Sequence, residues 1–132
     1  MRKFTAPPSL ADIEALANDA LGSIPDSMRR LVRNVPILIL DFPDEDLEEE
    51  MGLESPFDLL GIYAGVPETQ KSLLDVSTRP DMILLFRRPI LDYWCETAEE
   101  LAAIVRHVLI HEIGHHFGFS DDDMDRIEGG AY

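Results

Sequence analysis

The sequence has one cysteine, few basic residues and no long apolar run. Because a single cysteine, Cys95, excludes an intramolecular disulfide and suits a reducing compartment, we expect a cytoplasmic protein. The longest apolar runs, such as Met82–Phe86, are much shorter than the roughly 20 residues that cross a bilayer, which argues against a membrane partner. Polar residues and prolines interrupt residues 5–12, so we expect no secretion signal.

Basic residues are outnumbered by acidic ones. The chain has 11 lysines and arginines and 26 aspartates and glutamates, which gives a formal net charge of −15. Such a charge repels phosphate backbones and makes nucleic acid a poor partner. The acids gather between Asp41 and Asp58, and no lysine or arginine occurs between Arg33 and Lys71. We interpret segment 43–57 as a solvated loop; the other interpretation is a rim that attracts basic peptides.

Local patterns predict helices and strands within a single domain, residues 1–132. Hydrophobic residues make up 45% of the chain, which is enough for one packed core. One helix is predicted from its cap at Ser9 to Gly22, and Thr97-Ala-Glu-Glu100 resembles a capping box that begins the last long helix. The other predicted elements are a short helix over 26–33, strands over 35–42, 59–66 and 82–86, a loop over 67–80, and a turn or short helix over 90–94.

The last long helix carries the pattern H-E-x-x-H, formed by His111, Glu112 and His115. Residues four apart share one face of an α-helix, about 6 Å apart along its axis, so both imidazoles can reach one metal ion. Glu112 follows the first ligand and is placed to take a proton from a metal-bound water. Two imidazoles and a carboxylate suit Zn²⁺, and an open water position makes such a site catalytic.

A third ligand is expected shortly after this helix. Gly118 can end the helix in a left-handed turn, and the returning chain then brings Asp121 towards the same ion. Asp122 and Asp123 are the alternative ligands if the turn is longer. A different interpretation takes Ser120 as the N-cap of a short helix whose acidic first turn faces the positive end of the helix dipole.

The strand over 59–66 is the candidate substrate-binding edge. Gly61, Tyr63 and Gly65 share one face, and glycines there let another backbone approach closely. An extended peptide can add itself to such an edge through main-chain hydrogen bonds. Tyr63 is interpreted as a packing residue, with donation to an oxyanion as the alternative. We interpret His107 as a surface residue and His116 as a residue of the core or of the ligands' surroundings.

These motifs resemble a known family. The pattern H-E-x-x-H-x-x-G-x-x-D over 111–121, the segment Leu59–Pro67 and the strand Met82–Phe86 are similar to the minimal zincin-like metallopeptidases, a family of short bacterial proteins. Snapalysin-type proteases, which are related to the metzincins, show the same spacing of the metal motif. The resemblance extends over roughly residues 9–128, and the metal helix is its most specific part.

The resemblance implies a fold, a site and an activity. The fold is α+β, with a small mixed β-sheet packed against an active-site helix and N-terminal helices. The implied zinc ligands are His111, His115 and Asp121, with Glu112 as the general base of a metallopeptidase that acts on a peptide or protein, for which the acidic surface favours basic sequences. Two alternatives stay open: a zinc-binding peptide-recognition module without turnover, and a metal-dependent endoribonuclease, against which Glu112 and the charge of −15 both count.

Overall fold

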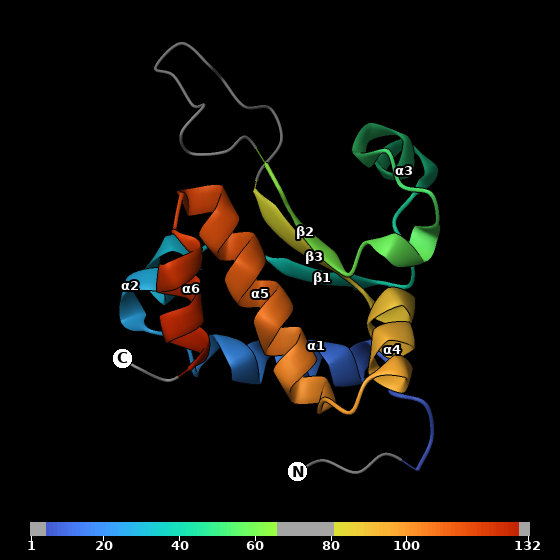
Figure 1. Ribbon diagram of the computed structural model, residues 1–132, viewed down its shortest axis with the longest axis horizontal. Coiled ribbons are helices and arrows are strands. Elements are labelled where there is room, and N and C mark those ends of the chain that lie inside the picture. The colour runs from blue at the N-terminus through green and yellow to red at the C-terminus, as the bar shows by residue number, and fades with distance from the viewer. Residues whose placement is uncertain (1–4, 66–80, 130–132) are drawn as a thin grey trace.

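The computed structural model describes residues 5–65 and 81–129. Two helices, α1 (Leu10–Leu21) and α5 (Leu101–Phe117), pack against each other and against a small β-sheet (Figure 1). The class is α+β, as predicted, and the loop expected over 67–80 lies outside the described residues. The remaining helical elements are α2 (Asp26–Arg29), η1 (Arg30–Val32), α3 (Glu45–Met51), η2 (Pro56–Asp58), α4 (Arg87–Glu96) and α6 (Asp121–Glu128).

The sheet is mixed and has three strands in the described chain, in the order β1-β3-β2. The central β3 (Met82–Phe86) pairs in parallel with β1 (Ile37–Leu40) and antiparallel with β2 (Gly61–Ala64). The expected mixed sheet is confirmed, and β2 lies at an edge. Because the Phe86 N–H donates to the Leu60 carbonyl at 2.9 Å and hydrogen-bonded pairs alternate along an antiparallel ladder, the main-chain groups of β2 residues 61 and 63 point away from β3.

One face of the sheet forms the core. Ile83 and Leu85 of β3 are fully buried and pack with apolar side chains of α1 and α5, among them Ile13 and Leu109. Burial of each such side chain stabilises the fold by about 1.5–3 kcal/mol, so α5 is held firmly under the sheet. Among the described residues, no helix is long and apolar enough to cross a membrane.

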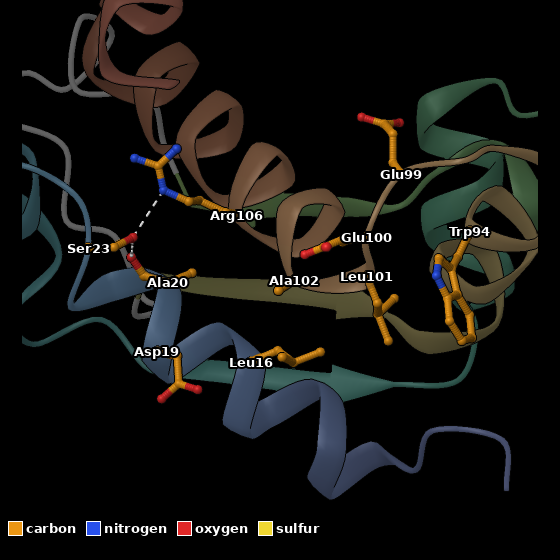
Figure 2. A pocket seen from close by; sticks show the side chains of 10 residues that line it. All are labelled: Leu16, Asp19, Ala20, Ser23, Trp94, Glu99, Glu100, Leu101, Ala102 and Arg106. Carbon is orange, nitrogen blue, oxygen red and sulfur yellow. Dashed lines mark hydrogen bonds between the residues drawn. The ribbon is translucent and has the colours of Figure 1, made fainter. Parts of the chain in front are cut away.

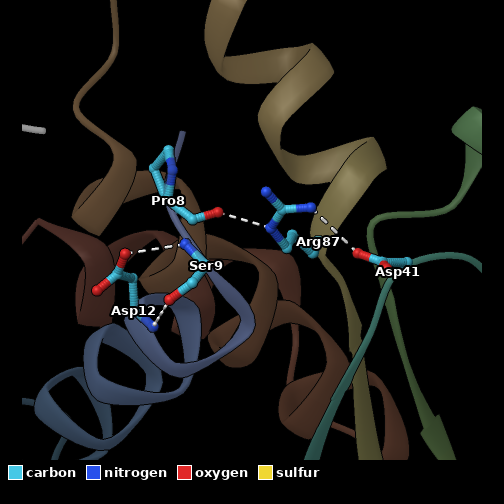
Figure 3. A network of polar contacts seen from close by, with 5 residues as sticks. All are labelled: Pro8, Ser9, Asp12, Asp41 and Arg87. Carbon is cyan, nitrogen blue, oxygen red and sulfur yellow. Dashed lines mark hydrogen bonds and ion pairs between the residues drawn. The ribbon is translucent and has the colours of Figure 1, made fainter. Parts of the chain in front are cut away.

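Helix α1 begins where the sequence predicts, at a capping box. The Asp12 N–H donates to Ser9 Oγ at 3.1 Å, and the Ser9 N–H donates to Asp12 Oδ2 at 2.8 Å (Figure 3). Directly before this cap, the Pro8 carbonyl accepts from Arg87 Nε at 2.6 Å, and Arg87 also contacts Asp41 Oδ1 at 3.2 Å. One arginine at the start of α4 therefore ties the lead-in to α1 to the end of β1.

The acidic segment over 43–57 is not the loop that we expected. It contains helix α3, which has Asp44 as its N-cap, with Asp44 Oδ1 accepting from the Leu47 N–H at 2.8 Å. Its first turn is acidic, which the helix dipole favours, and Gly52 ends it in a left-handed conformation with φ 66°. The helix has no buried residue, so the expectation of a solvated segment holds although the expectation of a loop is wrong.

The boundary between the last two predicted elements also differs. Helix α4 already begins at Arg87, since Pro89 lies in its first turn, where a missing N–H costs no hydrogen bond. It continues to Glu96, so Thr97 closes α4 instead of capping α5. Helix α5 then starts at Leu101 with Glu100 as its N-cap and without a side-chain cap, and the capping box predicted at Thr97 does not form.

Candidate metal centre

Helix α5 positions the H-E-x-x-H residues near its C-terminal end. Its apolar residues are buried on several sides, which fixes the rotation of the helix about its axis. Gly118 ends the helix in the left-handed conformation that we predicted, with φ 76°. The Phe119 N–H then donates to the Gly114 carbonyl at 2.8 Å, which turns the chain back towards α5.

The two motif histidines are neighbours on one face of α5. The ring centroids of His111 and His115 are 5.8 Å apart, with an angle of 78° between the ring planes. His115 is exposed, whereas His111 Nε2 is buried and accepts or donates no hydrogen bond within the described chain. Zinc binds imidazole nitrogen at about 2.0–2.1 Å. A buried ring nitrogen that has no hydrogen bond within the described chain fits such a metal ligand.

Asp121 is the first residue of α6, which lies beside α5 (Figure 1). Ser120 is the N-cap of this helix in a capping box with Asp123, so the short capped helix that was one of our two interpretations does form. Hydrogen bonds with the side chain and main chain of Ser120 lower the pKa of Asp123. Asp121 and Asp122 are exposed and stay predicted ligands.

Glu112 lies on the side of α5 that faces β2. Its Oε1 accepts from the Tyr63 N–H at 3.3 Å, and this N–H is one of the main-chain groups of β2 that point away from β3. Burial raises the pKa of the Glu112 carboxyl, and the hydrogen bond from Tyr63 and the charge of His115 act in the opposite direction. A half-buried carboxylate with a raised pKa, next to a predicted metal ligand in sequence, suits a general base.

Strand β2 contacts α5 through the face that holds the predicted substrate-binding residues. Gly61 is buried, and a Cβ atom there would lie 2.7 Å from Val108 Cγ1. The Tyr63 ring stacks on His116, with centroids 3.7 Å apart and planes at 13°, and its hydroxyl lies 3.1 Å from Asp81 Oδ2. Gly65, at the end of the strand, is exposed. Tyr63 is therefore a packing residue through its side chain, while its main chain faces the edge.

The structure brings together a group of possible ligands that shares His111 with the motif and includes a residue that the sequence analysis missed. Glu128 Oε1, from the end of α6, is 2.5 Å from His107 Nδ1 and 3.2 Å from His111 Nε2. Within the described ranges, these three residues form the group whose ligand atoms all lie within 4.8 Å of one another. The helical spacing of Met124, Ile127 and Glu128 was the available signal, because it puts all three on the side of α6 that meets α5.

A hollow of about 490 Å³ lies between α1, α4 and the first half of α5. Leu16 and Trp94 lie at its sides, and Arg106 Nε donates to Ser23 Oγ at 3.0 Å on its border (Figure 2). None of the predicted site residues lines it. The hollow is therefore separate from the candidate metal centre.

Comparison with known families agrees with the resemblance of the motifs. The profile of a family described as Zincin-like metallopeptidase matches residues 32–131, which include the whole of α5 and α6. No curated protein matches the chain.

Proposed function

The chain belongs to the zincin-like metallopeptidase family, and we propose from this that it is a zinc-dependent peptidase. In this proposal His111, His115 and Asp121 hold the ion and Glu112 is the general base. Bound zinc supplies a water of lowered pKa and polarises the peptide carbonyl. Glu112 accepts the proton of the attacking water and passes it to the leaving amine.

The observation that carries the proposal is the position of Glu112. Its carboxylate contacts the outward N–H of the edge residue Tyr63 at 3.3 Å, and it directly follows the ligand His111 in sequence. Glu112 thus adjoins both the outward main chain of β2 in space and the first motif histidine in sequence. Its pKa is raised by burial, which brings a carboxyl closer to the working pH of a peptidase.

The same contact supports β2 as the substrate-binding strand. A peptide that adds to β2 would pair with the outward main-chain groups of Gly61 and Tyr63, with Gly65 at the end of the strand. Its carbonyl would take the Tyr63 N–H, which Glu112 occupies in the free protein. Substrate binding would then release the Glu112 carboxylate for proton transfer.

The partner that we propose is a peptide or protein substrate. The net charge of −15 and the exposed acidic helix α3 favour basic sequences through electrostatic attraction. The same charge disfavours RNA, which counts against an endoribonuclease. A cytoplasmic location is part of the proposal and rests on the single cysteine, which is exposed in the fold.

The variant Glu112→Gln tests the proposal. We expect it to keep zinc, because Glu112 is not a ligand, and to lose peptide hydrolysis by about 10²- to 10⁴-fold, the usual contribution of a general base. A library of peptides and metal analysis of the purified protein give the two measurements. The matched control is Glu14→Gln, the same exchange at an exposed position of α1, which should hydrolyse like the wild type.

Three outcomes would count against the proposal. If wild type and Glu112→Gln cleave the library equally, the hydrolysis does not come from this site. If the protein binds peptides through β2 and neither form cleaves them, it is the recognition module without turnover. If the purified protein contains no zinc and its unfolding temperature does not rise when zinc is added, the proposed zinc site is wrong.

A further inference from the structure

Helix α5 carries three histidines at intervals of four residues, and only two of them belong to the H-E-x-x-H motif. His107, His111 and His115 form two overlapping pairs, with ring centroids 4.1 Å apart in the first pair and 5.8 Å in the second. Each pair has the spacing that lets two imidazoles share one ion. The helix itself therefore offers two places for a cation.

Helix α6 brings an acidic residue, Glu128, to the first of these places, and its other end follows the second place in sequence. It runs back along α5 after the turn at Gly118, so its first residue, Asp121, follows closely on the His111–His115 end, and its last residue, Glu128, reaches the His107 end. The seven steps along α6 cover about 10 Å and the eight steps from His107 to His115 about 12 Å, which are nearly equal lengths of helix. Glu128 therefore reaches the first histidine pair, while Asp121 stays the predicted acidic ligand of the second.

The contacts of Glu128 favour a cation at the first pair. Its Oε1 lies 2.5 Å from His107 Nδ1 and 3.2 Å from His111 Nε2, yet Glu128 Oε1 and His111 Nε2 are buried and form no hydrogen bond with the described residues. Ligand atoms around a tetrahedral zinc ion are separated by roughly 3.3 Å, from the usual bond lengths. The distance between His111 Nε2 and Glu128 Oε1 is already close to this value. The distance between His107 Nδ1 and Glu128 Oε1 would have to grow by less than about 1 Å.

We propose that His107, His111 and Glu128 form a second coordination position for a divalent cation of the zinc type. It shares His111 Nε2 with the position that H-E-x-x-H provides, so one ion fills one position or the other. An ion held there has His107 and Glu128 as ligands in place of His115 and Asp121, so this position serves as a resting or loading place for the ion. The contacts among His107, His111 and Glu128 support the second position independently of any activity. Only its link to catalysis rests on the proposed function.

The variant His115→Ala separates the two positions, because it removes a ligand from the first and none from the second. We expect this variant to keep one zinc ion with an affinity weakened about 10- to 100-fold, and the double variant His115→Ala/Glu128→Gln to lose a further 10- to 100-fold. Competition with a chromophoric chelator measures both. The matched control, His115→Ala/Asp125→Asn, removes an exposed acid of α6 and should bind zinc like His115→Ala.

Histidine ring nitrogens give a direct test that needs no hydrolysis. In ¹⁵N-labelled His115→Ala, added zinc should shift the signals of His107 Nδ1 and His111 Nε2. If the ring signal of His107 does not change with zinc, Glu128 only forms an ion pair that joins α6 to α5, and the proposal is wrong. Equal zinc affinity of His115→Ala and the Glu128 double variant would overturn it as well.

The test remains decisive if the double variant does not fold. His107→Gln then replaces Glu128→Gln in the His115→Ala background, since the His107 side chain is 56% exposed and contributes little to the core. The same loss of zinc affinity is expected. Failure here leaves the effect of Glu112→Gln on hydrolysis untouched, so the second position and the peptidase activity can be rejected separately.

Discussion

Helix α5 contacts β2 on one side and α6 on another, and the two contacts are built differently. Towards β2 the atoms have fixed positions: Glu112 accepts a main-chain N–H, and Gly61 lies against Val108 and against the backbone of β3. Towards α6 the closest neighbour of Gly114 is the flexible side chain of Met124, and the buried Glu128 Oε1 has no hydrogen bond within the described chain. The proposed general base thus belongs to a rigid contact, and the proposed ligand Glu128 to an adaptable one.

The difference matches two separate roles proposed for α5, proton transfer on the β2 side and metal binding on the α6 side. Proton transfer needs a base within hydrogen-bond reach of the attacking water, so a fixed contact is useful on the β2 side. Metal binding pulls its ligands to about 2 Å from the ion, so groups that can shift by a few tenths of an ångström are useful on the α6 side. Substitutions on the two sides of α5 test this difference.

The substitution Gly61→Ala tests whether the β2 contact is rigid. The new Cβ would lie 2.7 Å from Val108 Cγ1, 2.9 Å from Leu85 Cδ2 and 3.0 Å from the Leu84 carbonyl oxygen. Valine has a stiff χ1 and a backbone oxygen cannot turn away, so we expect unfolding free energy to fall by about 1–3 kcal/mol. Urea denaturation measures it.

The control is Gly22→Ala, where the nearest atom would be 3.4 Å away and φ is −69°. This variant should be as stable as the wild type or slightly more stable, because alanine reduces the entropy of the unfolded chain. An equal loss in both variants would show that the cost does not come from the contact between β2 and α5.

The sequence predicted the elements whose signals are local. The Ser9 cap, the strand Met82–Phe86 and the Gly118 turn appear where they were expected, because each depends on a few adjacent residues. Helix α3 was missed because its acidic composition indicated a solvated loop, although Asp44 and Gly52 are good caps. At Thr97 a local pattern was present, but the longer α4 uses that residue.

The candidate site was predictable to the same extent. The pair His111 and His115 follows from helical spacing alone, and the structure keeps their rings close together. The contact between Glu112 and Tyr63 joins residues 49 positions apart, and that of Glu128 depends on how α6 returns along α5. Tertiary packing creates both contacts, and no short motif encodes them.

Glu112→Gln also tests the fixed side through stability. Because burial raises its folded-state pKa, Glu112 favours the folded state most when protonated, and this contribution is lost as the pH rises through the folded pKa. Glutamine stays neutral and can still accept the Tyr63 N–H. In metal-free protein with a chelator, we therefore expect Glu112→Gln to raise the unfolding temperature by a few degrees at most at pH 7, with a smaller gain towards pH 5. A gain independent of pH would show that carboxyl charge is not its cause.

Gly114→Ala tests the adaptable side and should have the smallest effect. A Cβ there would lie 2.4 Å from Met124 Sδ and 2.9 Å from its Cγ, so the buried methionine has to move. Methionine has several rotatable bonds, and alanine is better than glycine inside a helix by about 0.8–1.0 kcal/mol, which offsets part of the cost. We expect a loss of unfolding free energy below about 1 kcal/mol, smaller than that of Gly61→Ala under the same urea conditions. A loss as large as that of Gly61→Ala would mean that α6 is held as rigidly as β2, and the shift of ligands towards an ion at Glu128 would then carry a comparable cost.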